Sequence, residues 1–562
     1  MANTRQVLTD RFIVFSGAGK KQSAFGTPLS NGDLDTRDKC TVTREEVVDR
    51  RVYMDCRNED PMNSKIITRL ARYTLEYSEV TPQIIARWTA YKEGASAAPT
   101  GSQADEVQTL TYSGTVSGGT FTLAMTLEGR TVTTKPIAYD ATPADVVKAL
   151  TAARMKFIEP GDVTATGGVK QKETLTVSGT ANADDNLGVT VTAAGATALA
   201  TGKTVEVAIA NGDTAAQVAE KIRTALGLDA DVSAFFTVSG TSAEVILEAK
   251  AAAANDTTMK VSYSTEFGMT GADSADTTAG VAADVWGSNP LTLTFDERLG
   301  YANLPLLTVD SANITGGGSI VAAQITPGDQ KYHAVTRSTS RVKPPITFAV
   351  GSDSDTDRVE KYADYVCESV SLNASLDGDV SMTVQILGPW EYDSIETTFN
   401  IPDCENIDPL QTKDCRIQID STWQTTDISS IAASINDNVP TDRLSAFGFD
   451  GIDVENLERG RQPTNTFSAS IFGSETDDLY ELAQNERTED PVAVNIHFGM
   501  PGNRCSWHFP KTEIRFQTNR TGYVGDAQYS TIQIDGLPLK DSTNPPFNAT
   551  AYVDQSTAFL AT

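Results

Sequence analysis

Two stretches between about residue 100 and residue 330 share one order of strand-like runs around a helix, and one stretch interrupts the other. The outer stretch runs from Gly118 to Gly168 and resumes at Leu291–Asp296 and Pro305–Asp310. The inner stretch covers about 170–284. Self-similar segments of this size indicate duplicated structural units. The order therefore predicts one small α+β domain of ββαβ type inserted into another, a plan that favours a structural or assembly protein.

Both stretches open their helix with the same signal. Thr142 and Thr214 are N-cap threonines, and Asp145 and Gln217 stand three residues further on, where each can reach back to the cap. The apolar positions that follow at helical spacing also correspond: Val146 with Val218, and Leu150 with Ile222. The flanking strands come in the same order, which favours a duplication.

The rest of the chain is also predicted to be mainly β. Short runs rich in Thr and Val, separated by 41 Gly and 23 Pro, are typical of strands joined by turns. A chain of 562 residues has room for three or four domains of about 100–200 residues. We predict six segments: 1–98 the first body segment, 99–168 the first outer-module segment, 169–284 the inner module, 285–328 the second outer-module segment, 329–395 the second body segment, and 396–562 a second β unit with the C-terminal tail.

Within the body, one helix has clear end signals. Thr81 is an N-cap residue, Pro82 takes the first helical position, and Gly94 is a C-terminal stop. Ile84, Ile85 and Trp88 share one face, which we expect to dock on a sheet. Residues 95–102 have the composition of a linker.

The later portion of the body repeats a pattern of paired strands. Tyr365–Gly388 predicts two strands around a turn at Asp377-Gly-Asp, and a similar pattern returns at 448–457 and 465–473, with a helix predicted from Ser474. The body is therefore either single or built from two related β units, 1–98 with 330–395 and 396–545.

Charge and cysteine content exclude several classes of protein. Lys and Arg number 45 against 74 Asp and Glu, a net charge of −29, which argues against a nucleic-acid-binding surface. No secretory signal and no apolar run of about 18 residues is visible. The six cysteines form no Cys-x-x-Cys pair, so we expect mostly buried thiols in a reducing cytoplasm.

Three motifs resemble nucleotide or metal sites and fall short of them. Ser16-Gly-Ala-Gly-Lys-Lys lacks the first glycine and the magnesium-binding hydroxyl of a P-loop. Asp353-Ser-Asp-Thr-Asp opens like a calcium loop, but Arg358 stands where that loop needs glycine. Cys505 and His508 form a pair without further ligands. We expect a turn, an acidic loop and ordinary packing at these places.

Catalytic residues are likewise not apparent. The other two histidines, His333 and His497, stand in no metal-ligand spacing, and no nucleophile elbow is present. Five arginines of the C-terminal region are read as ion-pair partners of the acidic excess, with a contact between subunits as the alternative: Arg459, Arg461, Arg504, Arg515 and Arg520. We predict no enzyme, no catalytic, cofactor-binding or metal site, and no cofactor.

Several of these segments resemble proteins of tailed bacteriophages. Residues 119–123, 137–146 and 305–310 look like a repeat of phage virion proteins, and Thr214–Ile222 looks like modules inserted in phage tail proteins. The helix from Thr81, and Cys367–Leu372 before a glycine turn and paired strands, resemble the major tail tube proteins of long-tailed phages.

The resemblance implies a tail-tube-type β-sandwich or barrel body with flanking helices. In that family, subunits join sheets into a ring and rings stack into a tube for DNA. It implies self-association in stacked rings, of three chains if the body is duplicated and of six otherwise. Partners would be tape measure, terminator and tail-tip proteins, with DNA passing without specific binding and no membrane contact. The virion tail is the expected location, after assembly in the host cytoplasm.

The resemblance also gives the inserted modules and the wall of the tube a place. The inserted modules would point outward, and the acidic excess would give a negative tube wall that repels DNA. The alternatives are a tail-tip or baseplate ring protein and, more remotely, a bacterial surface adhesin.

Overall fold

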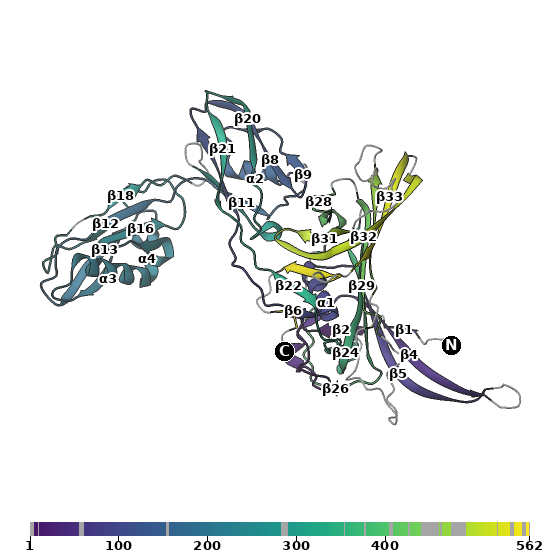
Figure 1. Cartoon of the computed structure of the whole chain (residues 1–562). Coiled ribbons are helices and arrows are strands. Elements are labelled where there is room, and N and C mark those ends of the chain that lie inside the picture. Colours follow the sequence, from purple (N-terminus) through teal and green to yellow (C-terminus); the bar gives the residue numbers. More distant parts are fainter. Residues whose placement is uncertain are drawn as a thin grey trace.

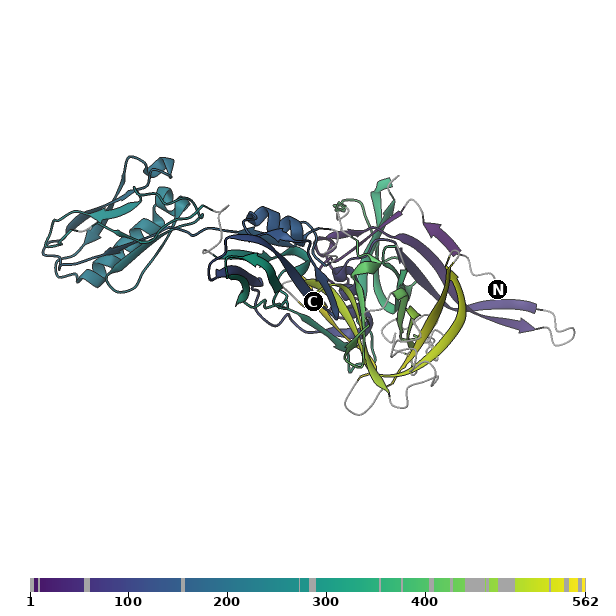
Figure 2. The same cartoon turned by 90° about the horizontal axis from the view of Figure 1, so that it is seen from above.

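The computed structural model describes the chain apart from residues 1–4, 9–10, 55–60, 153–156, 272, 283–289, 353–354, 376–377, 404–408, 425–427, 440–459, 461–463, 474–490, 525–526, 540–544, 554–557 and 561–562. It is mainly β, with several antiparallel sheets. Figure 1 shows a large β-rich body, the outer module beside it, and the inner module farthest away. The view from above in Figure 2 shows the same order.

The outer module is built from two stretches of chain that pair with each other across the inner module. Its elements are β7 Val107–Ser113, β8 Gly118–Leu127, β9 Arg130–Thr133, β10 Ile137–Ala138, α2 Pro143–Leu150, β11 Val163–Thr166, β19 Leu291–Phe295, β20 Thr308–Thr315 and β21 Ser319–Thr326. β19 lies between β11 and β7, and β20 pairs with β8. The strands after the inner module thus complete the sheets begun before it.

The inner module has two sheets and an apolar core of its own. Its elements are β12 Lys172–Thr176, β13 Asp185–Thr192, β14 Lys203–Ile209, α3 Ala215–Leu228, α4 Ala230–Phe235, β15 Phe236–Ser239, β16 Glu244–Ala249, β17 Lys260–Tyr263 and β18 Ala275–Thr278. Val218, Ile222 and Leu226 of α3 are buried in that core, as their spacing predicts.

The two modules have the same topology. One sheet has the order β11-β19-β7-β21 in the outer module and β15-β16-β12-β18 in the inner one. The other has β8 between β10 and β20, and β13 between β14 and β17. Both predicted capping boxes are present, at Thr142 with Asp145 and at Thr214 with Gln217. The duplication predicted from the helices therefore extends to every main strand.

The insertion point follows from this correspondence. The inner module enters between β11 and β19, and their counterparts β15 and β16 are joined by the short turn 240–243. A hairpin turn at the surface tolerates an insertion because its ends already lie close together. A sequence repeat that marks the first strand of each module, Gln108-Thr-Leu-Thr-Tyr-Ser-Gly-Thr and Glu173-Thr-Leu-Thr-Val-Ser-Gly-Thr, is a signal that helix matching alone missed.

The body contains two units with matching strands. The first unit comprises β2 Arg11–Phe15, β3 Thr36–Asp38, β4 Thr41–Met54, β5 Pro61–Tyr77, β23 Ile346–Ser352, β24 Asp355–Ser375, β25 Ser381–Pro389 and β26 Ser394–Glu396. The second comprises, in the same order, β27 Cys415–Ile419, β28 Thr422–Trp423, β29 Ile428–Asn436, β30 Thr464–Gly473, β31 Val492–Met500, β32 Asn503–Val524, β33 Ala527–Pro538 and β34 Asn548–Tyr552.

The strand pairings of the two units agree throughout the described chain. In the first unit, β2 pairs with β3 and β23, β4 with β5, β5 with β25, and β24 with β23, β25 and β26. In the second, the counterparts β27, β29, β30 and β32 make the corresponding pairs. The two units nevertheless share one apolar core, which runs from Ile13 to Leu560.

The predicted helix α1 Pro82–Glu93 begins and ends as its signals indicate. The Thr81 side chain accepts a hydrogen bond from the amide of Ile84, and Gly94 adopts the left-handed conformation at the C-cap. The expected docking of Ile84, Ile85 and Trp88 is confirmed, because Ile85 and Trp88 are buried in the apolar core and Ile84 packs against it. Arg87, Thr89 and Lys92 on the other sides of the helix are buried as well. Strands of both units surround the helix, so a charged side chain there is buried with a partner.

Three other sequence expectations have clear outcomes. The linker predicted at 95–102 is wrong, because β6 Gly94–Ser96 pairs with β22 His333–Arg337 and Thr100 bridges to Tyr332. The two strands predicted within Tyr365–Gly388 are confirmed as the pair β24 and β25. The pattern at 448–457 and the helix predicted from Ser474 lie outside the described residues, whereas the strand at 465–473 is confirmed as β30.

Candidate functional site: the joint between the units and the clamp to the outer module

The two units of the body are connected edge to edge. β24 of the first unit pairs with β29 of the second over seven positions, from Ser369 opposite Asn436 to Ser375 opposite Ser430. We call this pairing the joint. On one face of it, Val370, Leu372 and Ile435 are buried in the shared core. The joint makes one continuous sheet of two four-stranded blocks, β4-β5-β25-β24 and β29-β30-β33-β32.

The opposite face of this sheet carries small polar side chains. Alternation along the strands places there Thr74, Ser369, Ser371, Asn373, Thr383, Gln385, Ser430, Ser434, Ser468 and Ser470. Across the joint the hydroxyls of Ser371 and Ser434 are 2.8 Å apart. The face is therefore hydrophilic, and in the described region of the sheet it also carries charged groups of both signs, among them Glu76, Arg72 and Arg515.

Four buried charged groups lie beside the joint. Lys92 and Glu93 end α1, Lys343 precedes β23, and Asp437 follows β29; none of these side chains is more than 2% exposed. The Lys92 ammonium is 2.6 Å from Glu93 Oε1 and 3.4 Å from Asp437 Oδ1. Lys343 donates hydrogen bonds to Asp437 Oδ2 and to the backbone carbonyl of Lys92.

This charge cluster fastens the two units together. Asp437 belongs to the second unit, whereas its cationic partners belong to the first. Burial lowers the pKa of Lys343, and the Asp437 carboxylate opposes that shift. Two cations and two carboxylates balance in charge, which is the condition under which ions can be retained in a protein interior.

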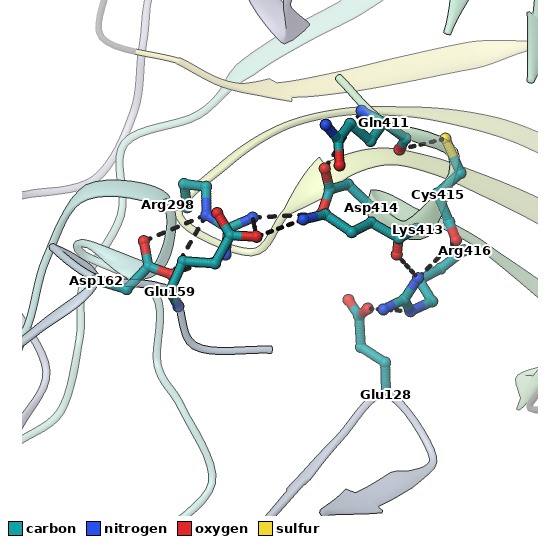
Figure 3. A network of polar contacts seen from close by, with 9 residues as sticks. All are labelled: Glu128, Glu159, Asp162, Arg298, Gln411, Lys413, Asp414, Cys415 and Arg416. Atoms are coloured by element: carbon teal, nitrogen blue, oxygen red, sulfur yellow. Dashed lines mark hydrogen bonds and ion pairs between the residues drawn. The ribbon is translucent and has the colours of Figure 1, made fainter. Parts of the chain in front are cut away.

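A second polar network, the clamp, holds the outer module on the second unit (Figure 3). Arg298 of the outer module is 2.8 Å from Asp162 of the same module and 3.3 Å from Asp414 of the body. Lys413 of the body pairs with Glu159 of the outer module. These residues form the first arm of the clamp. In it, cations and carboxylates of the outer module and of the body alternate.

The other arm of the clamp centres on Glu128, at the turn between β8 and β9. Its carboxylate is 2.6 Å from Arg504 and 3.7 Å from Arg416, both from the second unit of the body. Glu128 has a positive φ of 51°, a left-handed conformation that is uncommon for a residue other than glycine. Burial raises the pKa of Glu128 despite the two neighbouring guanidinium groups.

Burial acts on the first arm in the same way. It raises the pKa of Asp414, with Arg298 opposing. Burial alone would lower the pKa of Arg298, but the hydrogen bond to Asp162 and the nearby carboxylates raise it above its ordinary value. Glu128, Asp414 and Arg298 are thus held away from water and depend on partners across the contact, whereas the Lys413–Glu159 pair is exposed.

A hairpin tip of the body completes the contact. Met500, at the end of β31, is buried in the apolar core of the outer module. The amide of Gly502 donates to the Arg298 carbonyl at 2.9 Å, and its carbonyl accepts from Gln330 at 2.7 Å. The outer module is therefore packed onto the body and is more than a tethered appendage.

Replacing Gly502 with alanine should weaken this contact. A Cβ there would lie 2.6 Å from the backbone of Leu299 and Gly300, so the tip or the module must shift, at a cost of about 1–3 kcal/mol. Gly227→Ala is the matched control, since no atom lies within 4 Å of its added Cβ in α3; it should gain about 0.5 kcal/mol. Equal unfolding temperatures for the two variants would contradict the packed contact.

The motifs that resemble nucleotide and calcium sites have ordinary structural roles. Ser16 accepts a backbone hydrogen bond from Gly19 in a turn after β2, and Lys20 pairs with Asp33 at 2.6 Å. Asp355 and Asp357 lie in strand β24, so the backbone there is extended and does not form a calcium-binding loop. The predicted acidic loop is therefore wrong for these two residues, while 353–354 lie outside the described ones.

The histidines and cysteines also have structural positions. His333, His497 and His508 lie in β22, β31 and β32. Cys505 and His508 are three residues apart on one strand and so face opposite sides. In the described ranges no three His, Cys, Asp or Glu side chains gather in a metal-binding group. Four cysteines are confirmed as free thiols, Cys40, Cys367, Cys415 and Cys505.

The arginines singled out from the sequence divide into three groups. Arg504 is an ion-pair partner, as expected, but its partner Glu128 belongs to the outer module. Arg515 is exposed and lies 3.6 Å from Glu513. Arg520 lies in β32, and Arg459 and Arg461 lie outside the described residues. Sequence reasoning missed Arg298, Arg416 and the charge cluster, since nothing in their local sequence marks them.

Comparisons with known proteins add little. No protein family model matches the sequence, and no curated protein matches it. Among solved structures, the chain matches the crystal structure of the flagellar cap protein FliD from Helicobacter pylori at 9% identity, over 44% of this chain and 93% of that chain, with a TM-score of 0.14. A TM-score this low does not define a shared fold. None of the described helices is long and apolar enough to cross a bilayer.

Proposed function

We propose that the protein is a structural subunit that polymerises into rings, and that stacked rings form the tail tube of a long-tailed bacteriophage. The observation that carries this proposal is the pair of matching four-stranded blocks joined edge to edge by β24 and β29. A sheet assembled from equivalent blocks has a free edge at each end. Such edges are satisfied when further copies close the sheet into a barrel.

The duplication favours a ring of three chains. Three chains supply six four-stranded blocks, which corresponds to a barrel of about 24 strands. At about 4.8 Å between strands and a tilt of about 40°, that barrel has a backbone diameter of about 50 Å. Barrels of about 16–18 strands already leave an aqueous channel. A ring of this size therefore has a wide lumen, and the outer and inner modules lie on its outside.

The polar face of the sheet suits the wall of such a channel. Its serine, threonine and glutamine side chains offer DNA no apolar surface, and its arginines Arg72 and Arg515 lie beside the carboxylates of Glu368 and Glu513. The negative wall expected from the acidic excess is replaced in this proposal by a polar wall with charges of both signs. The proposal includes no enzymatic activity, and DNA passes without specific binding.

Electron microscopy and native mass spectrometry of the purified chain test the proposal. The expected result is stacked rings with external knobs, and a ring mass equal to three subunits. A chain that stays monomeric at high concentration and in virions would overturn it. One ring per virion in place of a stack would favour a tail-tip or baseplate ring protein.

A further inference from the structure

The strands that end the two blocks point to a specific contact between copies of this chain. We propose that β32 of one chain pairs with β4 of a second copy, in the register of the internal joint between β24 and β29. The inference rests on the proposed ring, and it adds the strands and residues that close the ring. The partner is therefore a second copy of this chain.

A short sequence repeat aligns the two blocks residue by residue. Thr383-Val-Gln-Ile-Leu-Gly in β25 corresponds to Thr531-Ile-Gln-Ile-Asp-Gly in β33. A Cβ added at either terminal glycine, Gly388 or Gly536, would overlap the ring of an aromatic residue, Tyr365 and Phe467 respectively. The repeat thus marks equivalent places, and the neighbouring strands are aligned from it by their observed pairings.

On one side of the repeat the alignment identifies the counterparts in β4 and β29. Tyr73 of β5 lies opposite Ile386 and pairs with Arg44 of β4. In the second unit, Ala469 lies opposite Ile534 and pairs with Ile431 of β29. Arg44 therefore corresponds to Ile431. Counting along both strands makes Val47 and Val48 the counterparts of Ser434 and Ile435.

On the other side the alignment identifies the counterparts in β24 and β32. Val370 lies opposite Val384, and Thr518 lies opposite Ile532. Val370 and Thr518 therefore correspond, as do the next residues, Ser371 and Asn519.

The register of the internal joint can then be transferred to two chains. Within one chain, Val370 is opposite Ile435 and Ser371 is opposite Ser434. The equivalent contact places Thr518 of one chain opposite Val48 of the next, and Asn519 opposite Val47. The register of β32 shifts after Asn519, so the transferred register ends at this residue.

Both strand edges are available in the described structure. Besides β33, no described strand pairs with β32 from Gln517 to Val524. Besides β5, none pairs with β4 from Val47 to Asp49. The strand β1 Arg5–Leu8 covers β4 only from Val42 to Glu45, and it runs antiparallel to β4 as an incoming β32 would. The transferred contact therefore covers Gln517–Asn519 opposite Val47–Asp49, and β1 occupies β4 from Val42 to Glu45.

Cysteine crosslinking between two variants tests this register. One variant carries Val48→Cys and the other Thr518→Cys; a second set carries Val47→Cys and Asn519→Cys. Successive pairs of an antiparallel ladder alternate between wide and close spacing, so one of the two sets has the spacing that a disulfide needs. After mixing and assembly, we expect that set to give an interchain disulfide, identified by mass spectrometry of the linked peptides.

The control set combines Val48→Cys with Asn519→Cys, which is out of register by one residue and places the thiols on opposite faces. It should give no disulfide above the unassembled mixture. Rings that form without a disulfide in either in-register set would overturn the β32–β4 contact alone. Failure of the unmodified chain to form rings would overturn the proposed function and this contact with it.

Discussion

Replacing Asp437 with alanine is expected to lower the free energy of unfolding by about 3–5 kcal/mol, because it removes one member of a buried charge cluster. The Lys92 and Lys343 ammonium groups are at most 2% exposed, and both contact this carboxylate. Without it, Glu93 is the remaining carboxylate of this four-residue cluster beside two buried cations. Chemical denaturation of the full chain measures the effect.

Two further variants separate this effect from a general loss of charge. Glu79→Ala removes half of an exposed ion pair, Lys39–Glu79 at 2.7 Å, and should cost less than about 1 kcal/mol. The double variant Asp437→Ala with Lys343→Met removes one cation together with the carboxylate, so it should recover some of the loss. An Asp437→Ala chain as stable as Glu79→Ala would show that the cluster does not fasten the two units.

A fall in pH from 7.5 to 5 is expected to destabilise the body by about 2–4 kcal/mol through two histidines. Burial, with a further effect from Arg504, lowers the pKa of His508 to about 4. Burial also lowers the pKa of His497 well below its ordinary value, and the nearby Arg504 and His508 lower it further. In the unfolded chain both rings titrate near pH 6.5. The unfolded state therefore binds more protons, and stability falls as pH drops below about 6.5.

The surroundings of the His497 and His508 rings explain why their pKa values are lowered. His508 shares hydrogen bonds with Asn495 at 2.9 Å and Thr550 at 3.2 Å, and His497 with Ser506 at 2.7 Å. A proton on either ring would add a charge beside Arg504. Glu128 and Asp414 act in the opposite sense, because a raised carboxyl pKa favours the folded state as the pH falls. Their effect begins above the ordinary carboxyl pKa values near 4, and it offsets part of the histidine effect.

Thermal unfolding between pH 7.5 and 5 measures the dependence. His508→Gln keeps a polar side chain but cannot take up the proton, so it should lose roughly half of the slope. A variant with the slope of the unmodified chain would contradict the assignment to His508.

Local features of the fold could be predicted from the sequence. The caps at Thr81, Thr142 and Thr214 and the stop at Gly94 depend on neighbouring residues, and the structure has them all. The strands of the two modules follow the alternation of apolar and polar residues, and their bounds agree with it to within a few residues. The linker at 95–102 was misread, because the pairing of Thr100 with Tyr332 depends on a partner more than two hundred residues away.

Two short repeats are also visible in the sequence. One is shared by β7 and β12, and the other by β25 and β33. The repeats are short, and β-rich sequences resemble one another, so only the strand order of the structure shows that the repeats mark equivalent strands. What the sequence alone determined is the set of local elements and their duplication, since caps and alternation act over a few residues. Only the tertiary structure decided the joint, the charge cluster and the clamp. Those contacts join residues such as Glu128 and Arg504, which are far apart in the chain and which only the packed core brings together.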